Sequence, residues 1–304
     1  MDYFYCITDS QGYIHSIDML YIEWFSKTRL ENLLDYIREL HEKYIDVRYE
    51  EYLERPRCSK YDFYLDAVVF GTVFLNMGKY VNYDNLTKSF DILPMFQLRF
   101  NPNKVMNEPY FKDFLALLLR EGSSGYIRKY DYAIDIPLPP GCVKIFSSRK
   151  EFGLYKGTRY YGQSGRHNYL KIYNKAAELE KQNVHQDNMT RVEYTFIGGQ
   201  IPSFESVYIL DPQLSNDYSG LNDTDKAIVD MYNTLLNFGF DYDLKLGRKK
   251  IEKLSKFLYG SYKLLEYGNI LDELLDYMEK YFDITSSPDD ALIPVLYDME
   301  LPFD

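Results

Sequence analysis

Residues 128–136 read RKYDYAIDI, and this stretch decides the fold. Its alternating pattern, with Ile134 and Ile136 as apolar neighbours, predicts a central strand in which successive side chains point to opposite faces. Asp131 and Asp135 therefore share one face, with the small Ala133 between them. Two carboxylates on one face repel each other unless a positive charge lies between them, and a divalent metal is the expected occupant because hard cations prefer carboxylate oxygens. The alternative is an exposed strand face with two solvated acids.

A second strand with the same spacing is expected at Arg191–Ile197. Arg191 and Glu193 share one of its faces, so Glu193 is a candidate third metal ligand. Arg191 is placed to hold a phosphate or to orient a carboxylate. Taken alone, the pair also fits a surface ion pair.

A tyrosine between two lysines follows a polar loop in YYGQSGRHNYLKIYNK, residues 160–175. Lys171, Tyr173 and Lys175 share a face of the expected strand. Nearby positive charge favours the phenolate, which is the form that attacks a phosphodiester, and it also neutralises the pentacovalent phosphate. A chain with 32 tyrosines also places one beside lysines by chance. The spacing alone leaves both interpretations open.

The charge of the chain is divided between a basic middle and an acidic end. The net charge of −11 argues against a partner that is a polyanion. However, residues 144–181 carry nine basic and three acidic side chains, whereas residues 271–304 carry ten acidic side chains and one lysine. The middle can therefore supply phosphate contacts, and our candidates are Arg159, Arg166 and His167. The histidines show neither HxH nor HExxH spacing, which argues against a histidine-only metal site.

A second basic element is expected as a helix near residue 250. Ile251, Leu254 and Leu258 would pack inward, and its lysines would lie along one side. We expect this helix to contact duplex DNA, although a solvated amphipathic helix fits the pattern equally well. Its candidate DNA-binding residues are Arg248, Lys249, Lys250, Lys253 and Lys256.

Strands with intervening helices up to about residue 200, followed by helices, predict an α+β fold. Residues 1–205 would form a sheet-based domain, residues 206–285 a helical extension, and residues 286–304 a flexible acidic tail. Helices are expected at Thr224–Asn237, Arg248–Tyr259 and Leu264–Phe282. The chain shows no run of 18 apolar residues and no signal peptide, and its three cysteines are too far apart for a disulfide framework or a zinc ribbon. We therefore expect a cytoplasmic protein that does not contact a membrane.

Four motifs in a fixed order resemble a known family. They are FQLRFNPNK at Phe96–Lys104, RKYDYAIDI, Tyr161-Gly162 leading to KIYNK at Lys171–Lys175, and TRVE at Thr190–Glu193. Together they resemble the trans-acting replication initiators of Gram-positive rolling-circle plasmids and the related relaxases of conjugative elements. The resemblance extends from about residue 15 to residue 260. The tail after residue 270 matches no motif of this family.

The resemblance implies a fold related to the HUH endonucleases, in which an antiparallel sheet carries an acidic metal site beside a tyrosine nucleophile. It implies nicking of one strand of plasmid origin DNA, a 5′-phosphotyrosyl intermediate with a free 3′-OH, and later rejoining. The unpaired nick site would lie in a hairpin with flanking duplex, and a homodimer would work with a host helicase. By position, Asp131, Asp135 and Glu193 match the acids that would hold Mg²⁺ or Mn²⁺. Tyr173 matches the nucleophile, with Tyr161 as the second candidate.

The two-histidine metal motif of the wider superfamily is absent, which leaves the identity of the metal open. Lys171, Lys175 or Arg191 would stabilise the charge of the transition state. Two other classes of function fit the same residues. One is a relaxase acting at a transfer origin, and the other is a DNA-binding protein that keeps the fold without the chemistry.

Overall fold

The structure is a computed structural model of the whole chain. It describes residues 4–284 except 27–34, 36–37, 40–41, 43–46, 56–57, 66–67, 85–88, 107–108, 146–150, 182–183, 186–187, 211–219, 238–248, 251–252, 255–256 and 258–261. The expected acidic tail lies outside these residues. In the part of the chain that the structure describes, no helix is long and apolar enough to span a membrane.

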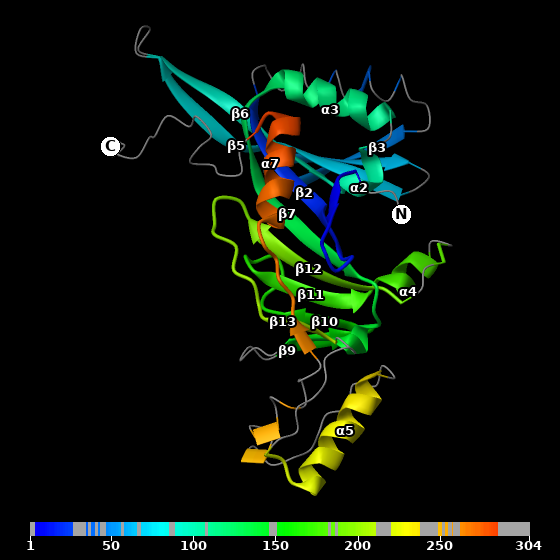
Figure 1. Ribbon diagram of the computed structural model, residues 1–304. Coiled ribbons are helices and arrows are strands. Elements are labelled where there is room, and N and C mark those ends of the chain that lie inside the picture. The colour runs from blue at the N-terminus through cyan, green and yellow to red at the C-terminus, as the bar shows by residue number, and fades with distance from the viewer. Residues whose placement is uncertain are drawn as a thin grey trace.

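One large antiparallel sheet dominates the molecule (Figure 1). The strand order is β3-β4-β5-β6-β2-β7-β12-β11-β10-β9, and β1 pairs with β2 outside this path. The strands are β1 (Cys6–Thr8), β2 (Ile14–Ser26), β3 (Val47–Arg55), β4 (Cys58–Leu65), β5 (Val68–Asp84), β6 (Ser89–Phe100), β7 (Gly122–Ile136), β9 (Glu151–Tyr155), β10 (Thr158–Tyr161), β11 (Tyr169–Asn174) and β12 (Thr190–Ile197). The predicted antiparallel sheet is confirmed.

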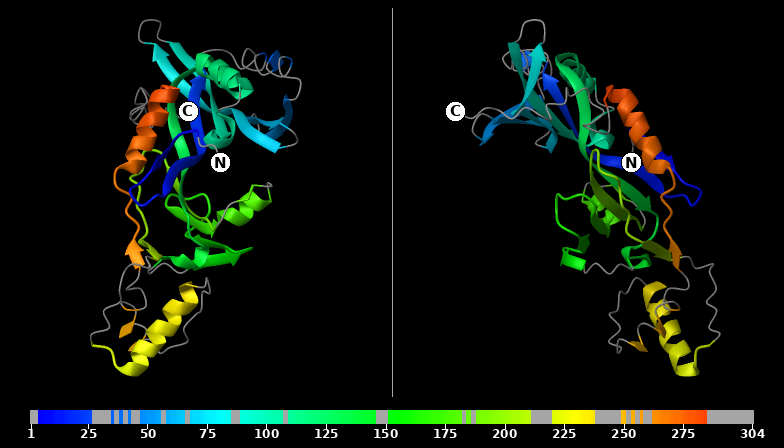
Figure 2. Two further views of the ribbon diagram at one scale, coloured as in Figure 1. Left: turned by 45° about the vertical axis from the view of Figure 1, so that its right-hand side comes forward. Right: turned by 90° about the vertical axis from the view of Figure 1, so that its left-hand side faces the viewer.

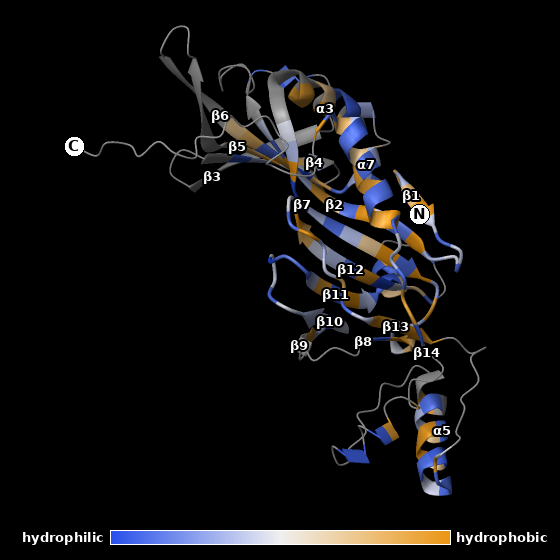
Figure 3. Ribbon diagram, turned by 60° about the vertical axis from the view of Figure 1, so that its left-hand side comes forward, coloured by the Kyte–Doolittle hydropathy of each residue, from blue (hydrophilic) through white to orange (hydrophobic). Residues whose placement is uncertain are grey.

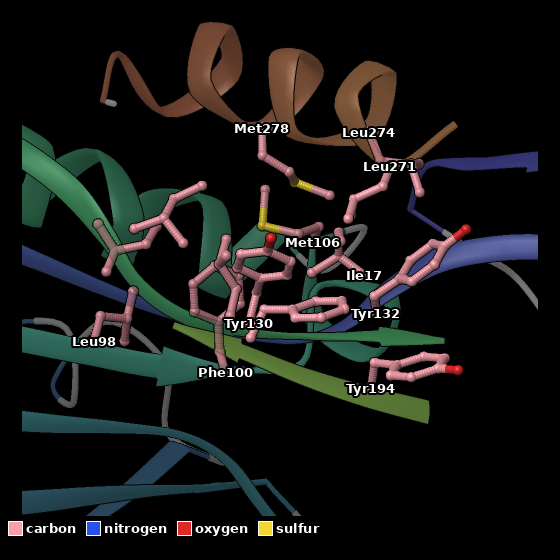
Figure 4. Close-up of a cluster of buried hydrophobic side chains, with 14 of the residues drawn as sticks. Ile17, Leu98, Phe100, Met106, Tyr130, Tyr132, Tyr194, Leu271, Leu274 and Met278 are labelled. Carbon is pink, nitrogen blue, oxygen red and sulfur yellow. The ribbon is translucent and has the colours of Figure 1, made fainter. Parts of the chain in front are cut away.

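The two faces of the central strands differ in character. One face is apolar and forms the main core, to which β7 contributes Tyr130, Tyr132 and Ile134 and β12 contributes Val192 and Tyr194. Figure 4 shows this core between the sheet and the last helix. The other face carries the charged side chains of the sequence motifs, and most of them are buried too. The alternative of an exposed strand face with two solvated acids is therefore wrong for Asp131 and Asp135.

Three of the described helices pack against the main sheet. They are α2 (Pro102–Val105), α3 (Pro109–Glu121) and α7 (Ile270–Phe282). The apolar side of α7 packs Leu271, Leu274, Met278 and Phe282 into the main core. Figures 1 and 3 show α7 lying across β2 and β7. This helix is therefore part of the main core, although it lies far from those strands in the sequence.

The expected division at residue 205 stays a prediction, but strand pairing crosses it. Residues beyond it form β13 (Val207–Leu210) and β14 (Tyr262–Leu264), which join β8 (Val143–Ile145) in a second, three-stranded sheet. Helix α5 (Asp223–Asn237) packs beside the short helix η1 (Pro140–Cys142) in a small separate apolar cluster. In Figure 2, α5 stands apart from the main sheet. The segment after residue 205 therefore contains strands as well as helices. Its last helix, α7, helps to bury the apolar face of the main sheet.

A buried histidine links β2 to β7. His15 Nδ1 lies 2.6 Å from the Tyr132 hydroxyl, and His15 Nε2 lies 3.2 Å from Asp9 Oδ2. Asp9 also accepts hydrogen bonds from the backbone N–H groups of Gln11 and Tyr13. The imidazole is fully buried, and burial lowers the pKa of His15 although the Asp9 carboxylate acts in the opposite direction.

This lowered pKa predicts a pH-dependent stability. Between the folded pKa of His15 and its ordinary value of about 6.5, the unfolded chain binds more protons, so the free energy of unfolding falls as pH drops below about 6.5. The loss is limited to about 1.4 kcal/mol per pH unit. Urea unfolding of the wild type and His15→Gln should show a difference that changes between pH 7 and 5. A constant difference across that range would contradict this account.

Candidate active site on the polar face of the sheet

The predicted site residues come from three adjacent strands. Side chains directly opposite or diagonal to one another across an antiparallel pair lie close together. In the register of the sheet, Asp135 lies opposite Arg191, Asp131 opposite Thr195, Arg191 opposite Tyr173, and Glu193 opposite Lys171. The structure therefore brings together Asp131, Asp135, Lys171, Tyr173, Arg191 and Glu193 on one face.

Arg191 is fully buried at the centre of this face. Its Nε and Nη2 donate to the two carboxylate oxygens of Asp135, each at 2.6 Å, and its Nη1 donates to Asp18 Oδ1 at 2.8 Å. Burial works to lower the pKa of Arg191, but Asp18 and Asp135 raise it well above its ordinary value. Of the two expected roles, the structure fits the one that orients carboxylates and not the one that holds a phosphate.

The same contacts determine whether Asp135 can bind a metal. Both of its oxygens accept hydrogen bonds from one guanidinium in a two-pronged arrangement, which is among the strongest side-chain pairings. A metal would have to displace Arg191 into a buried position without a partner, at high cost. Asp135 thus positions Arg191 and is a poor ligand, because its charge is already neutralised.

Asp18 is a site residue that the sequence motifs do not reveal. It lies where the register between β2 and β7 shifts, between Ile17 and Met19. Asn101 Nδ2 donates to Asp18 Oδ1 at 3.1 Å, and Asn103 Nδ2 donates to the Ile17 carbonyl at 3.1 Å. The turn at Asn101-Pro102-Asn103 therefore braces this irregularity. Burial works to raise the pKa of Asp18, but the positive charges of Arg191 and Lys175 lower it.

Tyr173 and Lys171 both contact Glu193. The Tyr173 hydroxyl donates to Glu193 Oε2 at 3.1 Å, and Lys171 Nζ forms a close ion pair with Glu193 Oε1. Burial and the Glu193 carboxylate raise the pKa of Tyr173. The expectation that flanking lysines favour the phenolate is therefore wrong for this state of the site, since Lys171 is paired with Glu193.

Tyr161 lies on the other face of the sheet. It is opposite Leu170 in the β10–β11 pair and belongs to the main apolar core. The neighbouring Tyr160 is opposite Lys171 instead, so its ring lies on the polar face. Tyr169, two residues before Lys171, lies on that face as well, and its ring stacks on Tyr160 with centroids 6.3 Å apart. Tyr173 and Tyr161 are therefore separated by the sheet, and only Tyr173 lies beside the acids.

Lys175 follows Tyr173 but does not continue the strand. Asn174 begins α4 (Lys175–Glu180), and its side chain accepts a hydrogen bond from the Ala177 N–H at 3.0 Å. Asn174 is thus the N-cap of this helix, so Lys175 does not share the strand face of Lys171 and Tyr173 as expected. Lys175 is buried, and its Nζ lies 3.1 Å from Glu178 Oε2. It is therefore held by an acid of its own helix.

The fit of a divalent metal depends on the acids that remain. In the part of the chain that the structure describes, no three His, Cys, Asp or Glu side chains form a group that could hold a metal ion. The expected three-carboxylate site is therefore not formed, because Arg191 holds Asp135. Asp131 and Glu193 come from adjacent strands and interact electrostatically, and Asp131 Oδ1 accepts a hydrogen bond from Thr195 at 2.7 Å. Mg²⁺ needs only one or two protein carboxylates together with substrate phosphate, so this pair still fits it.

Two of the expected DNA-binding residues have structural contacts. Arg159 donates to the carbonyls of Pro140 and Val143 at 3.0 and 2.8 Å. His167 Nδ1 accepts from the Ile197 N–H, so its Nε2–H donates to the Ile201 carbonyl at 2.9 Å. Both ring nitrogens are thus engaged within the protein. Arg166 lies exposed in the loop before β11.

The basic helix is described only in part, and Arg248 and Lys256 lie outside the described residues. Lys250 and Lys253 both pair with Asp225 of α5, at 3.1 and 2.8 Å, while Leu254 is buried. Lys249 is exposed. These contacts fit the amphipathic-helix interpretation, and a DNA-binding role for these lysines stays a prediction.

Further cations lie along the polar face beyond the acids. The Tyr21 ring lies between Lys129 Nζ, 4.8 Å from its centroid, and Arg99 Cζ, 5.2 Å from it. Lys129 is opposite Tyr21 on β7, and Arg99 is opposite Tyr21 on β6. Lys171, Lys129 and Arg99 therefore form a line of cations across the sheet.

Comparison with known proteins supports part of the resemblance. Residues 145–237 match a family model that describes the N-terminal part of a phage replication-associated protein. The resemblance to replication proteins is confirmed over this segment. The matched segment includes Lys171, Tyr173, Arg191 and Glu193, whereas Asp131 precedes it.

Other comparisons add little to this result. No curated protein matches the chain. A solved rolling circle replication initiator protein from Geobacillus stearothermophilus aligns over 91% of this chain and 99% of that chain, with 11% identity and a TM-score of 0.34. That similarity is too low to carry an argument about the site.

Proposed function

We propose that this replication-associated protein is a nickase that starts rolling-circle replication of a plasmid, with Tyr173 as the nucleophile. The observation that carries the proposal is the convergence of Tyr173, Lys171 and Glu193 at one opening of the polar face, inside the segment that matches a replication-associated family. A hydroxyl, a cation and a carboxylate within contact of one another are the groups that phosphodiester transfer needs.

Tyr173 attacks the scissile phosphorus while its hydroxyl proton passes to the Glu193 carboxylate that already accepts its hydrogen bond, and the bond to the 3′-oxygen breaks as that oxygen takes up a proton from water. The product is a 5′-phosphotyrosyl link with a free 3′-OH, and the reverse reaction rejoins the strand. In the resting site the raised pKa keeps the Tyr173 hydroxyl protonated. Substrate phosphate draws Lys171 away from Glu193, and the released ammonium then lies beside both the phenol and the developing phosphorane charge.

Arg191 acts through its neighbours and does not touch the phosphate. With Asp135 and Asp18 it fixes the backbone positions of β2, β7 and β12 relative to one another. The acids and the nucleophile are thereby held on rigid strands, which keeps the reacting groups in register. We infer that Arg191 and Asp135 are positioning residues of this site.

Asp131 and Glu193 are the residues that would hold Mg²⁺ or Mn²⁺. When bound, the metal polarises the scissile phosphate and neutralises charge that develops on its oxygens. Thr195 orients Asp131 by donating to its Oδ1. Asp135 is left out of this set because Arg191 occupies it.

A nicking assay tests the function and the metal together. Supercoiled plasmid that carries the cognate origin should be converted to the open-circular form when Mn²⁺ is added. EDTA should abolish this conversion, and Asp131→Asn should slow it on the order of 10²-fold. Thr195→Val removes only the orienting hydrogen bond and should cost less. Cleavage that persists in EDTA would contradict the metal proposal, and binding of origin DNA without any nicking would indicate a non-catalytic protein.

A relaxase would perform the same chemistry, so the substrate must separate the two functions. A plasmid with a double-strand replication origin and one with a transfer origin can be compared at equal superhelicity. We expect nicking of the replication origin only. Nicking of the transfer origin alone would assign the protein to conjugation.

A further inference from the structure

A cavity of about 360 Å³ opens beside the candidate nucleophile. Its walls are the β9–β10 hairpin on one side, and β11 with α4 on the other. Tyr173, Lys171 and Glu193 are among the residues that line it. Its volume lies within the range of roughly 300–1,000 Å³ that is typical of pockets for small organic ligands.

The hairpin holds an aromatic ring over this cavity. Strands β9 and β10 are joined by Lys156 and Gly157, both with positive φ (48° and 82°), and such two-residue turns are rigid. Tyr155 lies opposite Thr158, so its side chain is on the face that also carries Tyr160 and faces the cavity.

Tyr155 is 63% exposed in this position. Its neighbour Leu154 is 69% exposed and lies on the opposite face of the hairpin, away from the cavity. Single exposed apolar side chains are common on protein surfaces. The exposure of Tyr155 matters because Tyr160 lines the same cavity from the adjacent strand, which makes two aromatic rings available to one ligand.

Two lysines that line the cavity have no acidic partner in the part of the chain that the structure describes. Lys156 at the hairpin tip and Lys181 after α4 line the opening from opposite sides. Among the described residues, neither forms an ion pair with a carboxylate, whereas Lys171 is paired with Glu193 and Glu178 with Lys175. The Nζ of Lys156 lies 5.2 Å from the centre of the Tyr155 ring.

We propose that this cavity binds one unpaired nucleotide of the cut strand, next to the phosphate that Tyr173 attacks. The base stacks on the exposed Tyr155 ring, with Tyr160 beside it, and Lys156 and Lys181 contact the phosphates on either side of it. Aromatic rings and lysines in alternation are the usual means of holding single-stranded DNA without reading its sequence. A base inside a duplex is already stacked on its neighbours and cannot enter the cavity. The assignment of a cut strand rests on the proposed function, whereas the nucleotide subsite itself does not.

The test measures stacking directly in the full-length Tyr173→Phe variant, which binds without covalent chemistry. The probe is a short oligothymidylate with one 2-aminopurine in its centre, because the emission of that base changes when it stacks on an aromatic ring. Tyr155→Ala should remove the change in emission and weaken binding about 10-fold, whereas Tyr155→Phe should retain both. Leu154→Ala is the matched control, since it shortens an equally exposed side chain on the opposite face, and it should leave both unchanged.

Lys156→Ala should lower the dependence of log Kd on log salt concentration by about 0.7, which is the value for one phosphate contact on a single strand. Equal losses in Tyr155→Ala and Leu154→Ala would overturn the proposal, because they would reflect a disturbed hairpin. Equal affinity for the same probe annealed into a duplex would also overturn it.

The two proposals can fail separately. If the wild type nicks its origin but Tyr155→Ala binds the probe normally, the nucleotide subsite is wrong and the function stands. If no nicking occurs but the emission change depends on Tyr155, the subsite stands and the nicking function is wrong.

Discussion

Replacing Tyr173 with phenylalanine should abolish the covalent protein–DNA adduct and lower nicking on the order of 10³-fold or more, because the attacking oxygen is lost. The ring remains, so the packing of β11 against β12 is retained. Binding of origin DNA should therefore stay close to that of the wild type. The adduct can be measured on a suicide oligonucleotide, on which the cut strand cannot rejoin.

Tyr161→Phe and Tyr160→Phe are the controls for this prediction. The Tyr161 ring is in the apolar core, so losing its hydroxyl should leave the adduct intact. Tyr160 lies on the polar face, and its variant tests whether the Tyr160 hydroxyl is itself needed for the adduct. Full adduct formation by Tyr173→Phe would transfer the nucleophile to one of the other tyrosines on this face.

Among the substitutions considered, removing the Arg191 guanidinium should cause the largest drop in the free energy of unfolding. Arg191→Met leaves Asp135 and Asp18 without their shared cation, and Asp135 is almost fully buried. Breaking one side of a buried ion pair costs about 3–5 kcal/mol. Urea unfolding should therefore show a lower midpoint with a nearly unchanged slope.

A second substitution separates lost charge balance from lost packing. Adding Asp135→Asn to Arg191→Met removes one of the unpaired charges, so the double variant should recover part of the loss. The two changes should be clearly non-additive, since the residues contact each other directly. Additive losses would mean that the two side chains do not stabilise the sheet as a pair.

The period of two along a strand was enough to predict much of the candidate site. It placed Asp131 with Asp135, Arg191 with Glu193, and Lys171 with Tyr173 on common faces, and the sheet brings these three pairs to the same side. These predictions succeed because the side-chain direction in a strand depends only on position along the chain.

The contacts within that face could not be predicted in the same way. Which acid pairs with Arg191, and which of Tyr160 and Tyr161 faces the acids, depends on the register between strands distant in sequence. Asp18 reaches Arg191 because the register of β2 shifts beside it, and a shift of this kind has no clear mark in the local sequence. The period of two indicates three acids on this face. It does not indicate that the Arg191 guanidinium neutralises Asp135.

The place of α7 in the core has a consequence for synthesis of the protein. The ribosome completes the strands of the main sheet long before residues 270–282 emerge, at about 5–20 residues per second. During that interval Ile17, Tyr130 and their neighbours lack the cover that Leu274 and Met278 later provide (Figure 4). A product terminated before α7 would expose this apolar face, and we expect it to aggregate. The fold is therefore complete only in chains whose translation has passed α7.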